Sequence, residues 1–343
     1  ALHACGVYRC PNVRVLARAV ATNTPPSGAF RGFGAPQSLF ALERHMDEAA
    51  LRLGLDPVEL RRRNFLKIGD AMSTGQIIME NLDLAGLMDR SLAKLGYFEK
   101  REAARIHNAT GDPVKKGVGF SVFMHGCGFT GSGEGIMASV AGVEGTHEGH
   151  VAVLAASTEM GQGKDTVFSQ IAADALNLPY DMVEVAQPDT KIVPNSGPTV
   201  ASRSTMVVGK LVQTAAIALK QTLLQGGFLK EPYGAAVFQD AVKRYLAQNH
   251  TLRCYSQYHT PPQIVWDDAN HRGDAYPTYS WACYAAEVSV DTVTCEVKVD
   301  DFVAAQEVGK VINPTLAEGQ IEGGVAQGIG YGLWEDVQFT RGH

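Results

Sequence analysis

Residues 29–37 form the segment of the chain best suited to contact a planar ligand. They read Ala-Phe-Arg-Gly-Phe-Gly-Ala-Pro-Gln and combine two aromatic side chains, one arginine and two glycines. Glycine tolerates positive φ and lets the backbone approach a ligand closely, and Pro36 suits the first turn of a helix. Between its glycines, the ring of Phe33 can present its face to a flat molecule. The structural alternative is a tight turn around a buried phenylalanine.

Two further segments have the composition of anion-binding turns. Residues 160–163, Met-Gly-Gln-Gly, are predicted to join a strand to a helix, where a glutamine amide and unpaired backbone N–H groups suit an anion or an oxo group. Residues 197–205, Gly-Pro-Thr-Val-Ala-Ser-Arg-Ser-Thr, place hydroxyl groups at the expected positive end of a long helix. A simple turn between a strand and a helix explains the first segment equally well. In the second segment, capping of the helix N-terminus accounts for only one of the hydroxyl side chains. Together they indicate a phosphate-bearing cofactor held at several points.

Residues 319–330 are predicted to be a helix with small side chains along its length. They read Gly-Gln-Ile-Glu-Gly-Gly-Val-Ala-Gln-Gly-Ile-Gly. Small residues permit close helix packing, which is a purely structural explanation, while Gln320 and Gln327 still offer two amides to whatever lies nearby. Neither of the two anion-type segments, 160–163 and 197–205, matches a Rossmann G-x-G-x-x-G or a P-loop, so nucleotide binding of those kinds is disfavoured.

Composition limits the classes of function. The length of 343 residues predicts two domains, and an apolar fraction of 45% is sufficient for substantial cores. A net charge of −6 gives no basic field that would attract nucleic acid. No apolar run is long enough to predict a membrane span. The six cysteines lack the spacing typical of metal ligands, so we expect reduced, cytoplasmic thiols. For the same reason we expect no iron–sulfur cluster on this chain. His147 and His150 fit an exposed turn better than a metal site.

Hydrophobic periodicity predicts an α+β fold, in which mixed-sheet domains pack against helices. The expected helices cover residues 36–53, 56–61, 82–95, 164–176, 201–224, 232–247 and 314–334. The expected strands cover residues 12–22, 117–125, 136–143, 149–156, 181–187, 279–291 and 293–305. Residues 107–117 are polar and interrupted by glycine and proline, so we predict a boundary between a first domain at 1–110 and a second at 111–343.

The helix predicted over residues 36–53 has a clear apolar stripe that should face a core. Its members are Leu39, Leu42, Met46, Ala49, Ala50 and Leu53.

Taken in order, four motifs resemble those of the molybdopterin-binding subunit of the xanthine dehydrogenase and aldehyde oxidase family. They are Arg-Gly-Phe-Gly-Ala-Pro-Gln, Glu-Met-Gly-Gln-Gly, Pro-Thr-Val-Ala-Ser-Arg-Ser and Gly-Gln-Ile-Glu-Gly-Gly, and residues 56–64 and 308–314 fit the same pattern. The resemblance covers nearly the whole chain. It implies a molybdenum hydroxylase, which inserts an oxygen atom derived from water into a C–H bond of an N-heterocycle or an aldehyde.

The resemblance also implies roles for individual residues. Phe33 and Phe129 would stack on the substrate ring, with Thr130 beside it. Arg31 and Ala201 would lie next to molybdenum without ligating it, because the pterin dithiolene holds the metal in this family. The cofactor-binding residues would be Arg31, Gly32, Gly161, Gln162, Gly163, Val200, Ala201, Ser202, Ser204 and Gln320.

One family feature is missing from the sequence. The general base of the family is a glutamate in a Gly-Glu-Pro-Pro motif, which does not occur here and would lie beyond His343. We therefore expect this chain to be a central piece of the molybdenum subunit and assign it no catalytic residue. Glu322 and Glu335 lie in no matching motif and are interpreted as ordinary helix residues.

The resemblance implies a molybdenum–molybdopterin cofactor, with its cytosine dinucleotide form as one alternative. A [2Fe–2S] cluster and FAD would belong to partner subunits or domains, alongside the remaining parts of the molybdenum subunit in an oligomer. The function we favour is the oxidation of purine-like or other N-heterocycles, with water as the oxygen source. An aldehyde-oxidising member of the family, or a non-catalytic cofactor-binding scaffold, remains an alternative.

Overall fold

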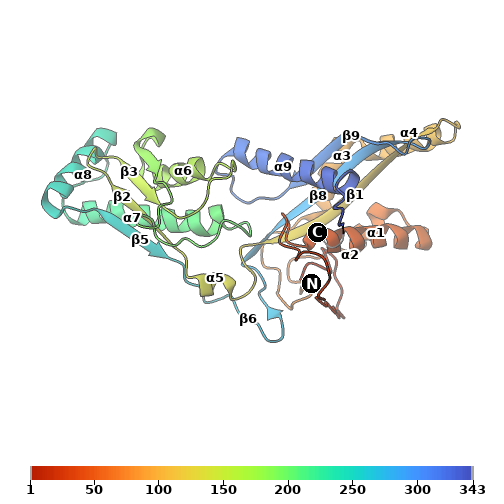
Figure 1. The fold of residues 1–343 in the computed structure, drawn as a ribbon, viewed down its shortest axis with the longest axis horizontal. Coiled ribbons are helices and arrows are strands. Elements are labelled where there is room, and N and C mark those ends of the chain that lie inside the picture. The colour runs from red at the N-terminus through yellow and green to blue at the C-terminus, as the bar shows by residue number, and fades with distance from the viewer. Residues whose placement is uncertain (1, 341–343) are drawn as a thin grey trace. The chain divides into compact units, whose positions relative to one another are not determined.

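The computed structural model describes residues 2–340 and contains two compact units (Figure 1). Unit 1 consists of Ala1–Gly126, Ala269–Gly309 and Ile321–His343, and unit 2 of Cys127–Asp268 and Lys310–Gln320. Each unit combines helices with a small sheet, so the α+β prediction is confirmed. The boundary between residues 110 and 111 stays a prediction. Within residues 2–340, no helix has the length and apolar character needed to cross a membrane.

Unit 1 is built on a three-stranded sheet with the order β1-β8-β9. The strands are β1 (Val114–Cys127), β8 (Thr278–Asp291) and β9 (Val297–Gln306). β8 and β9 form the antiparallel hairpin expected from the sequence, with a bulge at Glu287/Val288. Helix α3 (Leu84–Leu95) packs against both hairpin strands.

Three more helices complete this part of unit 1: α1 (Ala35–Leu53), α2 (Pro57–Asn64) and α4 (Tyr97–Asn108). The start of α2 follows its predicted cap, because Asp56 Oδ1 accepts a hydrogen bond from Val58 N at 2.8 Å and proline occupies the first turn. α4 was not expected from the sequence. Helix α9 (Pro314–Leu333) begins in unit 2 and ends in unit 1.

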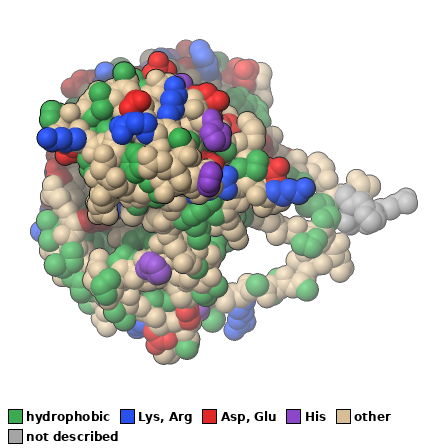
Figure 2. Space-filling view, turned by 90° about the vertical axis from the view of Figure 1, so that its left-hand side faces the viewer, with side chains coloured by type: hydrophobic (Ala, Val, Ile, Leu, Met, Phe, Trp, Pro, Cys, Tyr) green, Lys and Arg blue, Asp and Glu red, His purple; other side chains and the backbone are tan. Residues whose placement is uncertain are grey.

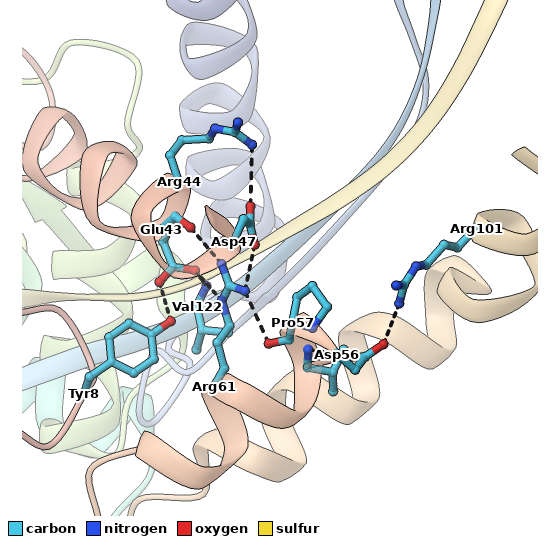
Figure 3. A network of polar contacts seen from close by, with 10 residues as sticks. Tyr8, Glu43, Arg44, Asp47, Asp56, Pro57, Arg61, Arg101 and Val122 are labelled. Carbon is cyan, nitrogen blue, oxygen red and sulfur yellow. Dashed lines mark hydrogen bonds and ion pairs between the residues drawn. The ribbon is translucent and has the colours of Figure 1, made fainter. Parts of the chain in front are cut away.

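A buried ion pair joins α1, α2 and β1 (Figure 3). Arg61 Nε donates to Glu43 Oε2 at 3.0 Å, and the same oxygen accepts from Val122 N at 2.9 Å. The Tyr8 hydroxyl donates to the other carboxylate oxygen, and burial followed by the Glu43 charge raises the pKa of Tyr8. The Arg61 guanidinium also lies 4.7 Å from the ring centroid of Phe120, which gives the cation an aromatic face as well.

The buried face of α1 differs from the predicted apolar stripe. Leu39 and Ala50 are buried as expected, but Glu43 is buried beside them and Leu53 is 64% exposed. The stripe was partly wrong because the Arg61 guanidinium places a carboxylate at a core position.

Unit 2 contains a four-stranded sheet with the order β4-β3-β2-β5. Its strands are β2 (Val140–Gly145), β3 (Val151–Leu154), β4 (Val183–Val185) and β5 (Arg253–Gln257). β2 is antiparallel to both β3 and β5, whereas β3 and β4 are parallel. Helix α6 (Lys164–Leu176) makes the crossover that a parallel pair requires.

Three helices bury their apolar faces in the core of unit 2: α6 (Lys164–Leu176), α7 (Gly209–Gln225) and α8 (Ala235–Asn249). Phe168, Leu219 and Phe238 are among their fully buried side chains. The short elements of the chain are α5 (Gly133–Met137), η1 (Tyr180–Met182), η2 (Ser204–Val208), β6 (Trp266–Asp267) and β7 (Arg272–Gly273).

Three predicted elements were wrong in whole or in part. Residues 12–22 form no strand and are almost all exposed, including Leu16 and Val20; alternation alone does not make a strand without a neighbour to accept its hydrogen bonds. The helix expected from residue 201 begins later, because Ala201 and Ser202 have left-handed φ values of 61° and 53° and helical turns start at Ser204. In addition, α5 occupies the first part of the strand expected over 136–143.

Candidate functional site

Three loops of unit 2 contain most of the residues singled out by the motifs. Loop A (residues 128–132) follows β1, loop B (residues 155–163) runs from β3 to α6, and loop C (residues 195–203) precedes η2 and α7.

Loop B and loop C lie side by side and are joined by two hydrogen bonds. Ala156 N donates to Ser196 Oγ at 2.9 Å, and Thr158 N donates to Thr199 Oγ1 at 2.8 Å. In both bonds a backbone N–H of loop B reaches a hydroxyl of loop C. The two anion-type segments, about forty residues apart in sequence, are thus neighbours in the fold.

Loop A is attached to loop C through backbone and side-chain contacts. Gly128 N donates to Ala201 O at 2.8 Å, and Phe129 N donates to Glu134 Oε1 at 3.1 Å. Glu134 in turn forms an ion pair with Arg203 at 2.9 Å. All three loops therefore belong to one connected region.

The N–H groups of loop B already have an anionic partner within the chain. The Glu159 carboxylate accepts from Gly161 N at 2.8 Å, Gly163 N at 3.0 Å and Asp165 N at 3.2 Å. Although partial burial opposes it, these N–H groups lower the pKa of Glu159. The expectation that Gly161 and Gly163 present unpaired donors was wrong for this conformation, because a carboxylate two residues before Gly161 occupies the helix terminus.

The side-chain amide of Gln162 is used within loop B. Its Oε1 accepts from Met160 N at 2.6 Å and its Nε2 donates to Thr158 O at 2.7 Å. Gly163 is required by its surroundings, because its φ is 79° and an added Cβ would lie 2.6 Å from a methyl carbon of Leu316. Loop B is therefore a rigid turn held by its own side chains.

The Arg-Gly-Phe-Gly segment of unit 1 forms the expected tight turn before α1. Phe33 N donates to Phe30 O at 2.7 Å, and His125 Nε2 lies 3.0 Å from the Gly32 carbonyl oxygen. The Phe33 ring is 75% exposed, so the alternative with a buried phenylalanine was wrong. Arg31 Nη1 donates to Gln327 Oε1 at 3.2 Å.

The small side chains of α9 have a local reason in unit 1. An added Cβ on Gly323 would lie 3.3 Å from Arg31 Nη1, and one on Gly324 would lie 3.9 Å from Arg31 Cζ. Small residues at these two positions leave room for the guanidinium beside the helix.

The predicted site residues divide between the two units. Arg31, Gly32 and Phe33 lie in unit 1. Those of unit 2 are Phe129, Thr130, Gly161, Gln162, Gly163, Val200, Ala201, Ser202, Ser204 and Gln320. Apart from Gln320 on α9 and Ser204 at the start of η2, the residues of unit 2 lie on loops A, B and C.

Sequence reasoning missed two carboxylates of this region. Glu159 stands directly before Met-Gly-Gln-Gly, so its place in the motif was a usable signal. Glu134 had no such signal, because its partner Arg203 is 69 residues away.

The region contains hydroxyl, amide and backbone groups rather than metal ligands. Among residues 2–340, no three His, Cys, Asp or Glu side chains are grouped so as to hold a metal ion. The face drawn in Figure 2 carries basic and acidic side chains intermixed. Donors and acceptors of this kind suit a large organic cofactor with amide, oxo and phosphate groups.

Comparison with known families identifies the chain. Residues 1–65 and residues 90–343 each match a family described as molybdopterin cofactor-binding domain. The chain belongs to this family. The sequence resemblance is thereby confirmed, and the cofactor of the family is molybdopterin with its molybdenum.

The relatives include enzymes named for two substrate classes. The aldehyde oxidoreductase of Megalodesulfovibrio gigas is 33% identical over 342 residues, covering 98% of this chain and 35% of that protein. The xanthine dehydrogenase molybdenum-binding subunit of Escherichia coli O157:H7 is 32% identical over 337 residues, covering 92% of this chain and 43% of the subunit. The chain thus spans less than half the length of these relatives, and their similar identities leave the substrate class open.

Solved structures share the fold. The aldehyde oxidoreductase from Desulfovibrio gigas superposes with a TM-score of 0.82 at 32% identity, over 96% of this chain and 35% of that one. The quinoline 2-oxidoreductase from Pseudomonas putida 86 gives a TM-score of 0.83 at 27% identity, over 98% of this chain and 45% of that one.

Proposed function

We propose that loops B and C bind one molybdopterin cofactor between them. Gly161, Gln162 and Gly163 would contact it from loop B. Val200, Ala201, Ser202 and Ser204 would contact it from loop C and the turn that follows. The observation that carries this proposal is the pair of hydrogen bonds that hold the two loops side by side.

The remaining cofactor contacts would come from Arg31, Gly32 and Gln320, with Arg31 and Ala201 next to the metal but not ligating it. When bound, the cofactor supplies a molybdenum centre that takes electrons from the substrate while water provides the oxygen atom. This chain's own part is to orient the cofactor and the substrate. The Arg31 guanidinium adds a positive charge, which stabilises negative charge developing nearby.

The substrate we favour is an N-heterocycle, purine-like or similar in shape. Phe33 and Phe129 would stack on its ring with Thr130 beside it, and the exposed ring of Phe33 supports this role. Relatives named xanthine dehydrogenase and quinoline 2-oxidoreductase are consistent with a flat substrate. An aldehyde is the second candidate, because an aldehyde oxidoreductase is equally similar.

The electron-transfer partners would be chains or domains that carry [2Fe–2S] clusters and FAD, in a cytoplasmic oligomer. We propose that the general base is a carboxylate outside these 343 residues, in the rest of the molybdenum subunit. The cytosine dinucleotide form of the cofactor is one form that the site would accept. If the assembled protein binds molybdopterin but turns over neither a heterocycle nor an aldehyde, the chain is a non-catalytic cofactor-binding scaffold.

Steady-state kinetics and metal analysis of the assembled protein test this function. We expect about one molybdenum and one pterin per chain, and turnover of a purine or quinoline. Phe33→Ala and Phe129→Ala should each raise KM for the heterocycle about 2–10-fold, since an aromatic contact is worth about 0.5–1.5 kcal/mol. KM for acetaldehyde should change less.

Phe40→Ala is the matched control, because Phe40 is 71% exposed on α1 outside the motif. Equal KM changes in all three variants would refute the stacking role. Absence of molybdenum and pterin from the assembled protein would refute the cofactor site itself.

A further inference from the structure

The side chain of Arg203 is buried at the centre of the loop region, and its N–H groups point to five acceptors. Its Nε donates to Glu134 Oε1 at 2.9 Å, and Nη2 donates to Glu134 Oε2 at 3.1 Å and Ser139 Oγ at 2.6 Å. Nη1 donates to Ser196 O at 2.8 Å and Pro198 O at 3.1 Å. Arg203 is 1% exposed and Glu134 is 3% exposed. A planar, fully engaged guanidinium fixes the directions of all its partners at once.

The two partners of this ion pair are each close to a proposed contact residue. Glu134 Oε1 also accepts from Phe129 N at 3.1 Å, so the carboxylate holds the backbone of the proposed substrate aromatic. Arg203 follows Ala201 by two residues, and Ala201 O accepts from Gly128 N at 2.8 Å. Two sets of contacts therefore connect Phe129 to Ala201. The first is the hydrogen bond from Gly128, the residue before Phe129, to Ala201 O. The second is the Glu134 carboxylate, which accepts from both Phe129 N and Arg203.

Loop C needs a side-chain restraint to keep its shape. Ala201 and Ser202 have φ values of 61° and 53°, and a left-handed backbone is unfavourable for a residue that carries a Cβ. Such a conformation persists only where the surroundings enforce it. The bonds from Arg203 to the carbonyl groups of Ser196 and Pro198 close the loop on itself and supply this restraint.

We propose that the Arg203–Glu134 pair is a positioning device that sets the placement of Phe129 relative to Ala201. In the proposed function, which this inference deepens, it fixes the substrate ring against the metal-side backbone. Neither residue touches the reacting atoms. Lysine at position 203 would keep the positive charge. It would lose the branched, planar guanidinium that donates to Ser139 Oγ, Ser196 O and Pro198 O as well as to Glu134.

The test uses Arg203→Lys in the assembled protein, with Arg253→Lys as the matched control. Arg253 forms a 2.8 Å ion pair with Glu144 in the same unit, and its side chain is 44% exposed. This pair lies at the end of β2 away from Val140, the strand residue whose N–H donates to Asn195 O of loop C. We expect Arg203→Lys to lower kcat/KM per bound molybdenum for a heterocycle about 10–100-fold, because misplacement by about 1 Å has effects of that order. The control should stay within twofold of the parent protein.

A role in folding alone would give a different result. It would lower the yield or the molybdenum content while leaving KM and kcat per molybdenum unchanged, and that outcome would overturn the proposal. If Arg203→Lys does not fold, Ser139→Ala removes one acceptor of the network and is expected to lower kcat/KM per molybdenum about threefold, the size of effect typical of one hydrogen bond. An unchanged value for Ser139→Ala in that case would also overturn it.

Amide hydrogen exchange gives a readout that does not depend on activity. Arg203→Lys should accelerate exchange at residues 128–130 and 199–202 together, whereas Arg253→Lys should leave both segments unchanged. Faster exchange confined to one segment would show that the pair does not couple the loops. If the protein holds no molybdenum, the proposed function fails, but this exchange experiment still tests the coupling.

Discussion

Unit 1 and unit 2 each contain a buried arginine–glutamate pair, and the two pairs stabilise different kinds of backbone. Arg61 and Glu43 connect α1, α2 and β1, elements whose own hydrogen bonds already define their backbone. Glu134 lies on the short helix α5, and with Arg203 it connects loops A and C, which have no regular hydrogen-bonding pattern. The Arg61 pair also packs on an aromatic ring.

The difference indicates what a buried ion pair contributes in each place. Removing one member leaves an uncompensated buried charge, which costs about 3–5 kcal/mol. Between regular elements that cost falls on the global stability of the unit. Between loops, part of it can be relieved by local rearrangement, so geometry at the site should change before the fold is lost. The following predictions test this contrast, from the largest expected effect to the smallest.

The largest effect is expected for Arg61→Met. Glu43 would keep the Tyr8 hydroxyl and Val122 N–H but lose its counter-charge, so the free energy of unfolding of unit 1 should fall by about 3–5 kcal/mol. Urea unfolding monitored by circular dichroism measures it. Arg62→Met is the control, because Arg62 pairs with Asp89 at the surface and should lose less than about 1 kcal/mol. Similar losses in both variants would contradict the special role of the buried pair.

The second prediction concerns a buried neutral group of unit 1. His3 Nε2 accepts from Gly126 N at 3.1 Å and its ring stacks on His125 at 4.6 Å. Burial, followed by the neighbouring His125, lowers the pKa of His3 from 6.5 to about 4. The unfolded state therefore binds more protons between these values, and stability is lost as the pH falls from about 6.5 to 4.

The size of this loss is at most about 3 kcal/mol, from about 1.4 kcal/mol per pKa unit. Unfolding titrations at pH 7, 5.5 and 4 measure it, with His3→Gln as the comparison because glutamine can still accept from Gly126 N. We expect a flatter pH dependence for the glutamine variant. Parallel curves would exclude His3 as the source.

A smaller effect is expected at the two glycines of loop B. Gly161 and Gly163 both have positive φ, so alanine at either costs about 1–2 kcal/mol. At Gly163 the new Cβ would also meet Leu316, whereas no described atom lies within 4 Å of the corresponding point at Gly161. Gly163→Ala should therefore lose about 1 kcal/mol more than Gly161→Ala and retain less molybdenum, as measured by thermal unfolding and metal analysis. Equal losses would mean that Leu316 moves aside freely.

The smallest effects are expected for exposed i,i+4 ion pairs, which occur in both units. Glu59 pairs with Arg63 at 2.6 Å in unit 1, and Asp240 pairs with Arg244 at 2.7 Å in unit 2. Glu59→Gln and Asp240→Asn should each cost only about 0.3–0.5 kcal/mol, and added salt should reduce the difference. A loss above about 1 kcal/mol for either would show that burial is not what separates the strong pairs from the weak ones.

Local signals were sufficient to predict much of the fold. The extent of α1, the Asp56 cap of α2, the start of α6 and the β8–β9 hairpin each depend on residues close together in sequence. Glu43 could not be predicted as a core residue, because the groups that make its burial favourable, Arg61, the Tyr8 hydroxyl and Val122 N–H, lie 18 to 79 residues away in sequence. The strand expected over 12–22 failed for the opposite reason: its local pattern was right for a strand, but no neighbouring strand pairs with it.

The candidate site was predictable as a set of motifs but not as an arrangement. The order of the motifs identified the family and the loops. The hydrogen bonds of Thr158 and Ala156 to loop C, and the Glu159 carboxylate on the N–H groups of loop B, depend on three-dimensional placement. The roles of the individual site residues stay predictions until the kinetics and metal analysis are done.

The left-handed backbone at Ala201 and Ser202 has a consequence for protein engineering. Glycine at either position would relieve the strain of the Cβ atom, so a laboratory selection for heat resistance alone would favour Ala201→Gly or Ser202→Gly. Both changes would also widen the range of conformations open to loop C. A thermostable variant obtained in this way would have a higher melting temperature but a lower turnover rate. Screens that aim to improve this protein should therefore measure turnover after heating rather than the fraction that stays folded.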